Sequence, residues 1–462
     1  MSSSDLKGKA VTVIGGARSG LAVARLLARH GAKVFLTDRG PATEGIEDAL
    51  HEARIAFEFG GHTARALDAD LAVISPGVPS TAPLVKQLDG MKVPVVSEIE
   101  TASWFCRAPI VAITGTNGKT TTTSLTGYLL RQSSAQTGHP RQVFVAGNIG
   151  YPFADYVEDT TEADAVVLEV SSFQLDHIRD FRPRVGVLLN ITPDHLDRYD
   201  YSFEKYAAAK YRLFENMTAG DTVVYNADDE ILAGFLPIAR QRRGFDALGF
   251  SVENELEHGA FVRGGSLVLR LPNLPEEVLM PTAELALPGR HNLYNSLASA
   301  IAARLMEVRS DIVRESLATF EGVPHRLEFV RELDGVRYVN DSKATNVNAV
   351  WYALESFGRE KVVLIAGGRD KGNDYAALRP LVRDRTRAIV ALGESADKVM
   401  RDLGASAPVA EQAASMEDAI RRARRLARPG DVVLLSPACA SFDMFENYED
   451  RGDTFKRLVL SL

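Results

Sequence analysis

Short runs of aliphatic and β-branched residues alternate with helical stretches along most of the chain. Near the N-terminus, residues 11–14 (Val-Thr-Val-Ile), 34–37 and 71–74 have the composition of strands, and residues 21–27 have that of a helix. Strands that alternate with helices are typical of parallel sheets, because parallel neighbours are joined by a crossover connection. The pattern therefore predicts an α/β fold.

Two more series of this kind follow the first. Their predicted strands cover residues 109–113, 142–145, 165–168 and 185–189 in one series, and residues 338–339, 362–365, 388–392 and 432–435 in the other. The polar segment 133–141 between two of these elements is predicted to be a surface loop.

The three series predict three domains, with boundaries near residues 97 and 322. The second boundary lies in the turn-rich segment 320–324. We expect a Rossmann-like N-terminal domain over 1–97, a central domain with a mostly parallel sheet over 98–322, and a Rossmann-like C-terminal domain over 323–462.

Charge and composition exclude several classes of protein. Lysine and arginine total 53 against 61 acidic residues, a net charge of −8, whereas nucleic-acid-binding domains usually carry a basic excess. No stretch is long and apolar enough to cross a membrane as a helix, and the first residues lack the pattern of a signal peptide. Cys106 and Cys439 are too few for a disulfide framework, so we expect a cytoplasmic protein that binds neither nucleic acid nor membrane.

The first glycine cluster, residues 15–20 (Gly-Gly-Ala-Arg-Ser-Gly), follows a strand and opens a helix. It nearly fits the dinucleotide-binding pattern, with Ala17 in place of the middle glycine and Asp38 at the end of the next strand. The N-terminus of a helix attracts phosphate, so a ligand with a nucleoside diphosphate is favoured over a tight turn without a ligand. The local residues do not distinguish NAD from a UDP-sugar.

The second glycine cluster, residues 115–120 (Gly-Thr-Asn-Gly-Lys-Thr), also lies between a strand and a helix. It resembles a P-loop with a shortened spacing, so we expect the central domain over 98–322 to be a P-loop-type ATPase domain. In such a loop the backbone N–H groups hold phosphates, Lys119 supplies a cation and the Thr120 hydroxyl binds Mg²⁺.

Acidic and histidine side chains follow the next two predicted strands. Glu169 ends the strand 165–168, and the segment 190–197 after the following strand contains Asp194 and His195. The carboxyl ends of parallel strands meet at one edge of a sheet, and Mg²⁺ prefers oxygen ligands. This edge is therefore predicted to hold magnesium beside a nucleoside triphosphate. Lys210 ends the helical stretch 203–210, and composition alone predicts a solvated lysine there.

Taken together, these motifs resemble the Mur ligase family of cytoplasmic, ATP-dependent, amide-forming enzymes of peptidoglycan synthesis. The resemblance covers nearly the whole chain and is carried by residues 115–120, 169–174, 190–197, 289–292 with Asn295, 325–328 and 340–346. Within the family, segments 341–346, 367–372 and 436–443 are most similar to the members that add D-glutamate. The Asp-Asn-Pro-Arg motif of the diaminopimelate-adding members is absent.

The resemblance implies that a monomer joins D-glutamate to UDP-N-acetylmuramoyl-L-alanine through an acyl phosphate. It implies ATP, a pair of magnesium sites and a carbamylated Lys210. The N-terminal domain then binds the UDP end of the substrate, the central domain binds ATP and the C-terminal domain binds glutamate, which favours a UDP-sugar over NAD at the first glycine cluster.

The implied site residues fall into four sets. Those for the UDP-substrate are Gly15, Ala17, Arg18, Asp38, Arg39, Gly77, Asn148 and Ser171. Those for ATP are Gly115, Thr116, Asn117, Gly118, Lys119, Thr120, Thr121, Asn292, Asn295, Arg326 and Asp341. Those for glutamate are Thr345, Lys371, Ser441, Phe442 and Tyr448. The metal ligands are Thr120, Glu169, His195 and carbamylated Lys210, and the catalytic residues are Lys119, Glu169, His195 and Lys210.

Four alternatives remain open on the sequence. Two are ligases: one that uses L-glutamate, and one that resembles folylpolyglutamate synthase and shares the ATP-binding core. The third is a nucleotide-sugar-binding protein without turnover, and the fourth is an NAD-dependent dehydrogenase. The intact set of Lys119, Glu169, His195 and Lys210 argues against a protein that has lost its activity.

Overall fold

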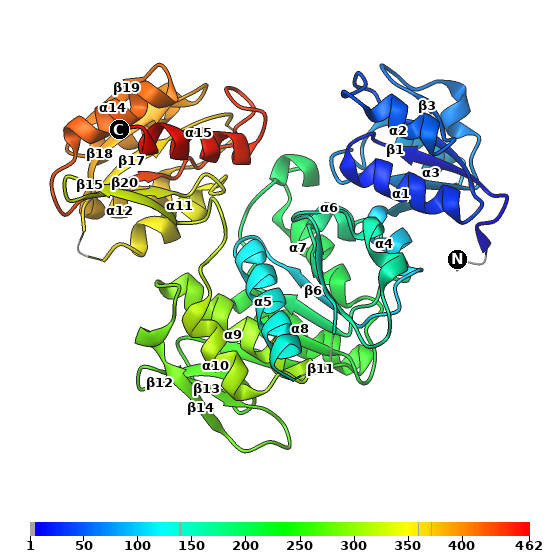
Figure 1. Ribbon diagram of the computed structural model, residues 1–462, viewed down its shortest axis with the longest axis horizontal. Helices are drawn as coiled ribbons and strands as arrows, with labels where there is room; N and C mark the ends of the chain where they lie inside the picture. Colours follow the sequence, from blue (N-terminus) through cyan, green and yellow to red (C-terminus); the bar gives the residue numbers. More distant parts are fainter. Residues whose placement is uncertain (1–4, 138–140, 359, 371) are drawn as a thin grey trace. The chain divides into compact units, whose positions relative to one another are not determined.

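The computed structural model describes residues 5–137, 141–358, 360–370 and 372–462. Within these residues the strands form three sheets of five, nine and six strands, each accompanied by helices (Figure 1). The prediction of three α/β domains is therefore confirmed. The chain divides into two compact units: Met1–Thr282 with Tyr294–Ala318, and Ala283–Leu293 with Thr319–Leu462. Each unit is described by itself.

The first sheet has the strand order β3-β2-β1-β4-β5, and its neighbouring strands pair in parallel. The bounds of its strands are β1 Ala10–Ile14, β2 Lys33–Thr37, β3 Ala56–Glu58, β4 Leu71–Ile74 and β5 Val95–Ser97. The helices of this part are α1 Arg18–Arg29, α2 Ile46–Glu52, α3 Pro83–Gly90 and α4 Glu98–Ser103. The Ser97 hydroxyl caps α4 by accepting the backbone N–H of Glu100, so this helix begins directly at the end of the sheet.

The central sheet has the strand order β14-β13-β12-β11-β10-β9-β6-β8-β7. Its strands are β6 Ile110–Thr114, β7 Val143–Gly147, β8 Ala165–Glu169, β9 Val185–Leu188, β10 Thr222–Asn226, β11 Asp246–Ser251, β12 Gly259–Arg263, β13 Ser266–Arg270 and β14 Glu277–Pro281. Its helices are α5 Lys119–Thr137, α6 Ser172–Leu175, α7 Phe203–Tyr211, α8 Glu230–Arg243, α9 Arg290–Leu305 and α10 Ser310–Thr319. The pairing from β7 to β12 is parallel and only the β12–β13–β14 edge is antiparallel, as the mostly parallel prediction requires.

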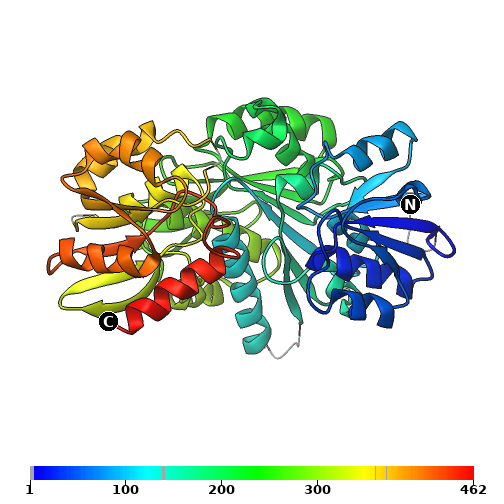
Figure 2. The ribbon, with the colours of Figure 1, turned by 90° about the horizontal axis from the view of Figure 1, so that it is seen from above.

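The third sheet has the strand order β15-β16-β20-β17-β18-β19 and is parallel except for the β15–β16 hairpin. Its strands are β15 Glu328–Leu333, β16 Val336–Asn340, β17 Val362–Ala366, β18 Thr386–Leu392, β19 Ala410–Ala413 and β20 Val432–Leu435. Its helices are α11 Val347–Glu355, α12 Arg379–Arg385, α13 Ala396–Leu403, α14 Met416–Leu426 and α15 Tyr448–Leu460. In Figure 2, α14 and α15 lie on the same side of this sheet, and α14 packs against both α15 and β18.

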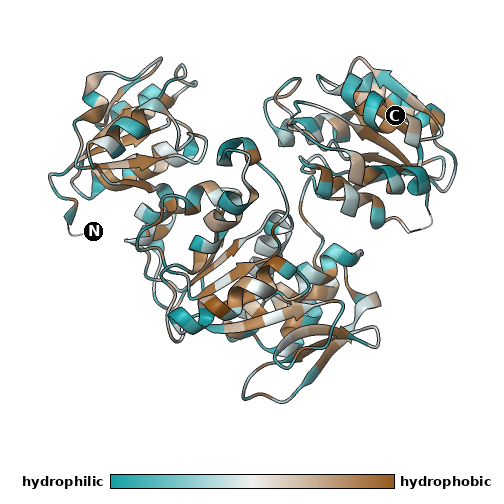
Figure 3. Cartoon of the chain, turned by 180° about the vertical axis from the view of Figure 1, so that it is seen from behind, coloured by the Kyte–Doolittle hydropathy of each residue, from teal (hydrophilic) through white to brown (hydrophobic). Residues whose placement is uncertain are grey.

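The sheet interiors are apolar, as the strand patterns predict. Every residue of β4, β6, β8, β17 and β20 is buried, and the hydropathy colouring is brown along the strands and teal on the outer helix faces (Figure 3). Continuous apolar runs are typical of parallel strands that are covered on both faces. Among the described helices, none is long and apolar enough to span a membrane.

One prediction of local structure is wrong. The segment 133–141 was expected to be a loop, but α5 continues to Thr137, while residues 138–140 lie outside the described part of the chain. The polar residues at the end of α5 suit an exposed helix end as well as they suit a loop, so polarity alone did not separate the two.

Candidate active site

The second glycine cluster forms the turn between β6 and α5, and β6 lies inside the central sheet between β9 and β8. Gly118 has φ +85°, and a Cβ on it would lie 2.5 Å from the Asn295 side-chain oxygen, so a larger residue does not fit there. That oxygen accepts a hydrogen bond from the Thr122 hydroxyl at 3.1 Å. The turn at the start of α5 is thus packed against α9, which carries Asn295.

The chain after β9 holds this turn in place. The Asn190 side chain accepts from the backbone N–H of Asn117 at 2.9 Å and donates back to its carbonyl at 3.1 Å. The Thr116 hydroxyl donates to the Thr192 carbonyl and accepts from the Thr192 N–H, both at 3.0 Å. Paired hydrogen bonds of this kind fix a loop before any ligand arrives, which lowers the entropic cost of binding.

Two lysine amines converge on one carbonyl oxygen of the turn. Lys119 Nζ donates to Gly115 O at 2.9 Å and to Thr116 O at 2.8 Å, and Lys210 Nζ donates to the same Gly115 oxygen at 2.9 Å. Lys210 is 1% exposed and its amine lies 4.7 Å from the centre of the Tyr206 ring. The expectation from composition alone that Lys210 is solvated is therefore wrong.

Burial and the neighbouring Lys119 lower the pKa of Lys210 well below its usual value, although Asp194 and Asp176 oppose this shift. Burial disfavours the charged form of an amine, and a second positive charge adds to that effect. A neutral amine is the form that reacts as a nucleophile.

Glu169 ends β8 beside the turn, where its backbone pairs with Ile113 of β6. The side chain is 1% exposed. Its Oε1 accepts a hydrogen bond from the Asn148 side-chain amide at 2.7 Å, while its Oε2 is buried and makes no hydrogen bond to any described residue. A buried carboxylate oxygen without a partner is costly, so this atom fits a metal ion or another cationic ligand.

His195 lies in the segment that follows β9 and has a left-handed backbone, with φ 51°. Its ring is 5.1 Å from that of Phe173 in an edge arrangement, and its Nε2 is 3.7 Å from an Asp194 carboxylate oxygen. Among the described residues, no three histidine, cysteine, aspartate or glutamate side chains form a group that could hold a metal ion. The one buried carboxylate oxygen of Glu169 that lacks a partner suits Mg²⁺, which usually takes one or two carboxylates and completes its shell with phosphate oxygens and water.

The first glycine cluster forms the equivalent turn between β1 and α1, and Asp38 organises it. One Asp38 oxygen accepts the Gly16 N–H at 2.6 Å and the other accepts the Gly40 N–H at 2.7 Å. Arg18, Arg39 and Gly77 are exposed around the turn. The two predicted substrate residues of the central domain have structural partners, since Asn148 binds Glu169 and Ser171 caps α6 in a capping box with Gln174.

The predicted ATP residues are divided between the two units. Residues 115–121 and Asn295 belong to the first unit, whereas Asn292, Arg326 and Asp341 belong to the second. Asp341 is buried, accepts from the Ser436 hydroxyl at 2.8 Å and lies 3.6 Å from an Arg326 nitrogen. Burial raises the pKa of Asp341 to about 6, against the opposing effect of Arg326.

The predicted glutamate residues lie in loops at the carboxyl ends of β16 and β20 and at the start of α15. Ser441 is buried, Thr345 and Tyr448 are half-buried and Phe442 is 61% exposed. Lys371 lies outside the described residues. Lys343, which sequence analysis did not assign, donates from its amine to the Tyr448 hydroxyl at 3.1 Å.

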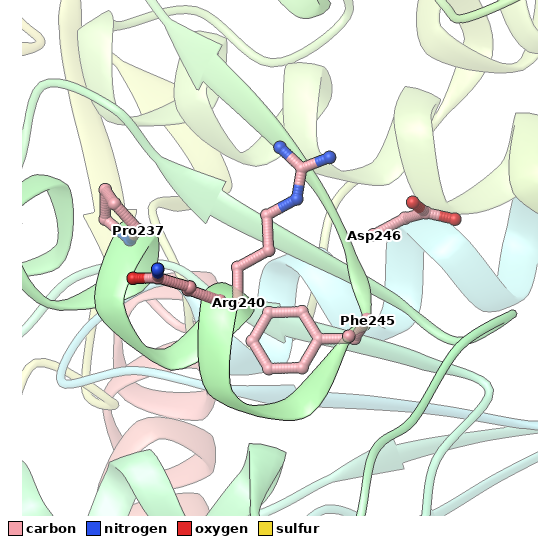
Figure 4. A pocket seen from close by; sticks show the side chains of 6 residues that line it. Pro237, Arg240, Phe245 and Asp246 are labelled. Carbon is pink, nitrogen blue, oxygen red and sulfur yellow. The ribbon is translucent and has the colours of Figure 1, made fainter.

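A separate pocket of about 350 Å³ lies at the end of α8 (Figure 4). Pro237, Arg240, Phe245 and Asp246 line it, and the Arg240 side chain extends from the helix past the Phe245 ring. No predicted site residue lines this pocket.

Sequence analysis missed the residues that support the site. Asn190 and Thr192 lie in the motif segment 190–197, but the sequence pattern assigns neither of them a role. Tyr206 lies in the predicted helix 203–210 and was likewise assigned no role, although its hydroxyl lies 3.1 Å from that of Thr116. The signal available for Asn190 was its place immediately after an apolar strand adjacent to the glycine turn.

Three family models match successive parts of the chain. They are the Mur ligase MurD-like N-terminal domain over residues 9–97, the Mur ligase middle domain over 113–303, and the Mur ligase glutamate ligase domain over 325–439.

Full-length relatives agree with these matches. A UDP-N-acetylmuramoylalanine–D-glutamate ligase of Salinibacter ruber is 61% identical over 462 residues, and one of Chloroherpeton thalassium is 49% identical, each covering 100% of both chains. The solved structure of a MurF ligase of Thermotoga maritima in complex with ADP shares the fold at 18% identity, with a TM-score of 0.60 over 99% of this chain and 97% of that one. The chain belongs to the Mur ligase family, and the full-length relatives named above are UDP-N-acetylmuramoylalanine–D-glutamate ligases.

Proposed function

We propose that the protein joins D-glutamate to UDP-N-acetylmuramoyl-L-alanine in a reaction coupled to the cleavage of ATP to ADP and phosphate. The observation that carries this proposal is the preformed phosphate-binding turn of residues 115–120 beside the buried Glu169, in a chain with a full-length relative of that activity at 61% identity. The MurD-like N-terminal match favours a UDP-linked substrate over NAD at the first glycine turn.

The three domains divide the binding of the substrates in this proposal. Residues 1–97 hold the uridine nucleotide, through Gly15, Ala17, Arg18, Asp38, Arg39 and Gly77, with Asn148 and Ser171 of the next domain near the rest of that substrate. Residues 98–322 hold ATP through 115–121 and Asn295. Residues 323–462 hold glutamate through Thr345, Lys371, Ser441, Phe442 and Tyr448. Arg326 and Asp341 of the same domain bind ATP, as does Asn292 of the central domain.

The reaction has two steps. The free carboxylate of the alanine substrate attacks the γ-phosphorus of ATP, so that a carboxylate oxygen–phosphorus bond forms and the bond to ADP breaks. The glutamate amine then attacks the acyl carbon, and the carbon–oxygen bond breaks as phosphate leaves and the amine loses a proton. Backbone N–H groups of the glycine turn and the cations Lys119 and Arg326 stabilise the negative charge on the transferring phosphoryl group.

Magnesium fits the residues at this edge. Thr120, Glu169, His195 and a carbamylated Lys210 would hold it, and the unpartnered Glu169 oxygen supports this assignment. When bound, the ion supplies positive charge to the phosphate oxygens. The low pKa of the buried Lys210 supports carbamylation, because only a neutral amine adds to CO₂, and the product is an anionic oxygen donor.

A phosphate-release assay tests the function. We expect release only when ATP, UDP-N-acetylmuramoyl-L-alanine and D-glutamate are all present, with L-glutamate much less active in a parallel reaction. Faster release with L-glutamate would assign the other stereochemistry, and release with a folate substrate in place of the UDP-sugar would assign a folylpolyglutamate synthase-like ligase. No release under any of these conditions, or a nicotinamide absorbance change, would contradict the proposal.

A further inference from the structure

Arg451 is a buried arginine in the first turns of α15. Its residue is 2% exposed, which is rare for arginine without a carboxylate partner. All three guanidinium nitrogens donate to neutral oxygens: Nε to the Ser342 hydroxyl at 3.0 Å, Nη2 to the Ser342 carbonyl at 2.8 Å, and Nη1 to the Cys439 carbonyl at 3.1 Å.

These contacts join the loops that follow neighbouring strands. Ser342 follows β16 and Cys439 follows β20, and the two strands pair in parallel. The third loop follows β17, where a Cβ placed on Gly368 would lie 3.2 Å from Arg451 Nη1. The Ser342 hydroxyl in turn donates to the Tyr448 carbonyl at 2.8 Å, so the start of α15 belongs to the same network.

The positive charge of Arg451 is not neutralised by an ion pair. Among the described residues, no acidic oxygen lies within ion-pairing distance of it, and Asp341 and Asp443 act on it only at longer range. Burial lowers the pKa of Arg451 to about 10, which leaves the guanidinium charged at neutral pH. A buried, unpaired charge is expensive for folding, so a purely structural role would be filled at lower cost by a neutral side chain.

The loops that Arg451 joins carry residues that are proposed to bind glutamate. Thr345 lies three residues beyond Ser342, Ser441 two beyond Cys439, and Tyr448 is tied to Ser342. Glutamate carries two carboxylates, and a fixed positive charge beneath its loops favours such a ligand.

We propose that Arg451 is a positioning residue for the acidic amino acid. It fixes the loops after β16 and β20 in the geometry that receives glutamate, and its charge, which has no ion-pair partner among the described residues, raises the affinity for the two carboxylates of glutamate. It does not touch the reacting atoms. The inference rests on the proposed function and identifies what holds the amino-acid site together.

The test measures glutamate binding and the phosphorylation of the substrate carboxylate separately. Hydroxylamine is a small neutral nucleophile that attacks an acyl phosphate without a binding site for glutamate. Hydroxamate formation in its presence therefore measures ATP-dependent activation of the substrate carboxylate, while glutamate-dependent product formation measures the complete site. Both are measured in the wild-type protein, Arg451→Gln and Arg451→Lys.

We expect Arg451→Gln to raise the KM for glutamate by at least about tenfold, the scale of one or two charge-assisted hydrogen bonds, with hydroxamate formation and the KM for ATP little changed. Arg451→Lys keeps the charge but not the planar fork, so its KM for glutamate should fall between those of Arg451→Gln and the wild type. Arg331→Lys is the matched control, because Arg331 Nη1 donates to backbone carbonyls at the far end of α15, and its KM for glutamate should be unchanged.

Other results contradict the inference. Equal loss of hydroxamate formation and of ligation in Arg451→Lys would mean a general structural role, and this comparison holds even if Arg451→Gln has no cooperative melting transition. An unchanged KM for glutamate in both variants would also overturn it. Absence of hydroxamate in the wild-type protein would instead refute the proposed function.

Discussion

The two glycine turns of the first unit have the same backbone plan and different surroundings. Both follow a buried parallel strand and open a helix, α1 in one case and α5 in the other. In the first turn an acidic side chain, Asp38, accepts the backbone N–H groups of Gly16 and Gly40. In the second, the amide of Asn190 fixes the backbone, and two lysine amines converge on the Gly115 carbonyl.

The difference indicates that the backbone of such a turn does not by itself set its chemistry. Both helix N-termini present N–H groups, which suits phosphate in general. The lysines and the unpartnered Glu169 oxygen make the second turn suitable for phosphoryl transfer, because charge must be stabilised as it moves. Among the residues that the structure describes, the first turn carries the exposed Arg18 and no buried lysine or arginine, as expected for a turn that binds a nucleotide without transferring its phosphate.

The largest difference between the two turns is expected when one cation is removed from each of them. Lys119→Ala should lower kcat by at least about 100-fold, because a charged donor to the transferring phosphoryl group is lost. Arg18→Ala should leave kcat nearly unchanged and raise the KM for the UDP-substrate. Steady-state kinetics with each substrate varied in turn measures both, and equal effects of the two variants on kcat would show that the turns do not differ in role.

The next effect concerns the carboxylate beside the second turn. Glu169→Gln keeps the shape and the hydrogen bond partner Asn148 but removes the negative charge. We expect the magnesium concentration for half-maximal activity to rise by roughly tenfold or more, since a ligand charge is lost. Magnesium titrations of wild-type and variant proteins measure this. Coincident titration curves would remove Glu169 from the metal site.

A smaller effect is expected at the first turn. Asp38→Ala leaves the Gly16 and Gly40 N–H groups without their acceptor, which costs about 1–3 kcal/mol where such groups are shielded from water. Melting temperature should fall and the KM for the UDP-substrate should rise, with kcat preserved. Asp48→Ala, an exposed aspartate in α2, is the control. A loss of kcat equal to that of Lys119→Ala would contradict a purely binding role.

The least effect on turnover is expected at Glu98, which opens α4 on the way from the first sheet to the second. Burial raises its pKa to about 7 from 4.5, and its Oε2 has no hydrogen-bond partner among the described residues. The folded protein then binds more protons than the unfolded chain between these values, so stability falls as pH rises through that window, by up to about 3 kcal/mol.

Glu98→Gln cannot titrate, so this part of the pH dependence should disappear while activity is kept. Urea unfolding at a series of pH values from below 4.5 to above 7 measures the slope. If wild-type and variant slopes are the same, Glu98 does not titrate in this range.

Many of the parallel strands, and the position of Glu169 at the end of one of them, could be predicted from the sequence. The run 165–168 predicted β8 and the position of Glu169, because a short apolar, β-branched run that is followed by a carboxylate is typical of a buried strand in a parallel fold. Several strands were not predicted, among them β10, β11 and the antiparallel edge from β12 to β14. The strands of that edge lack the strand–glycine–helix alternation that identified β1 and β6, so their pairing depends on contacts that a local pattern does not contain.

Side-chain environments were harder to predict than the backbone. Lys210 and Arg451 belong to residue types that are normally solvated, and both are buried by elements distant in the sequence. The partnership of Asn190 with Asn117 likewise joins residues that are 73 positions apart. Each of these features arises only when separate strands bring their loops to one edge.

An oxygen-labelling experiment tests directly whether the substrate carboxylate is phosphorylated. UDP-N-acetylmuramoyl-L-alanine is prepared with heavy oxygen in its free carboxylate and turned over with ATP and D-glutamate, and the released phosphate is analysed by mass spectrometry. If the second turn transfers a phosphoryl group to the carboxylate, each released phosphate carries one labelled oxygen from the substrate. Unlabelled phosphate would mean that the carboxylate is never phosphorylated, and it would contradict the role assigned to the second turn.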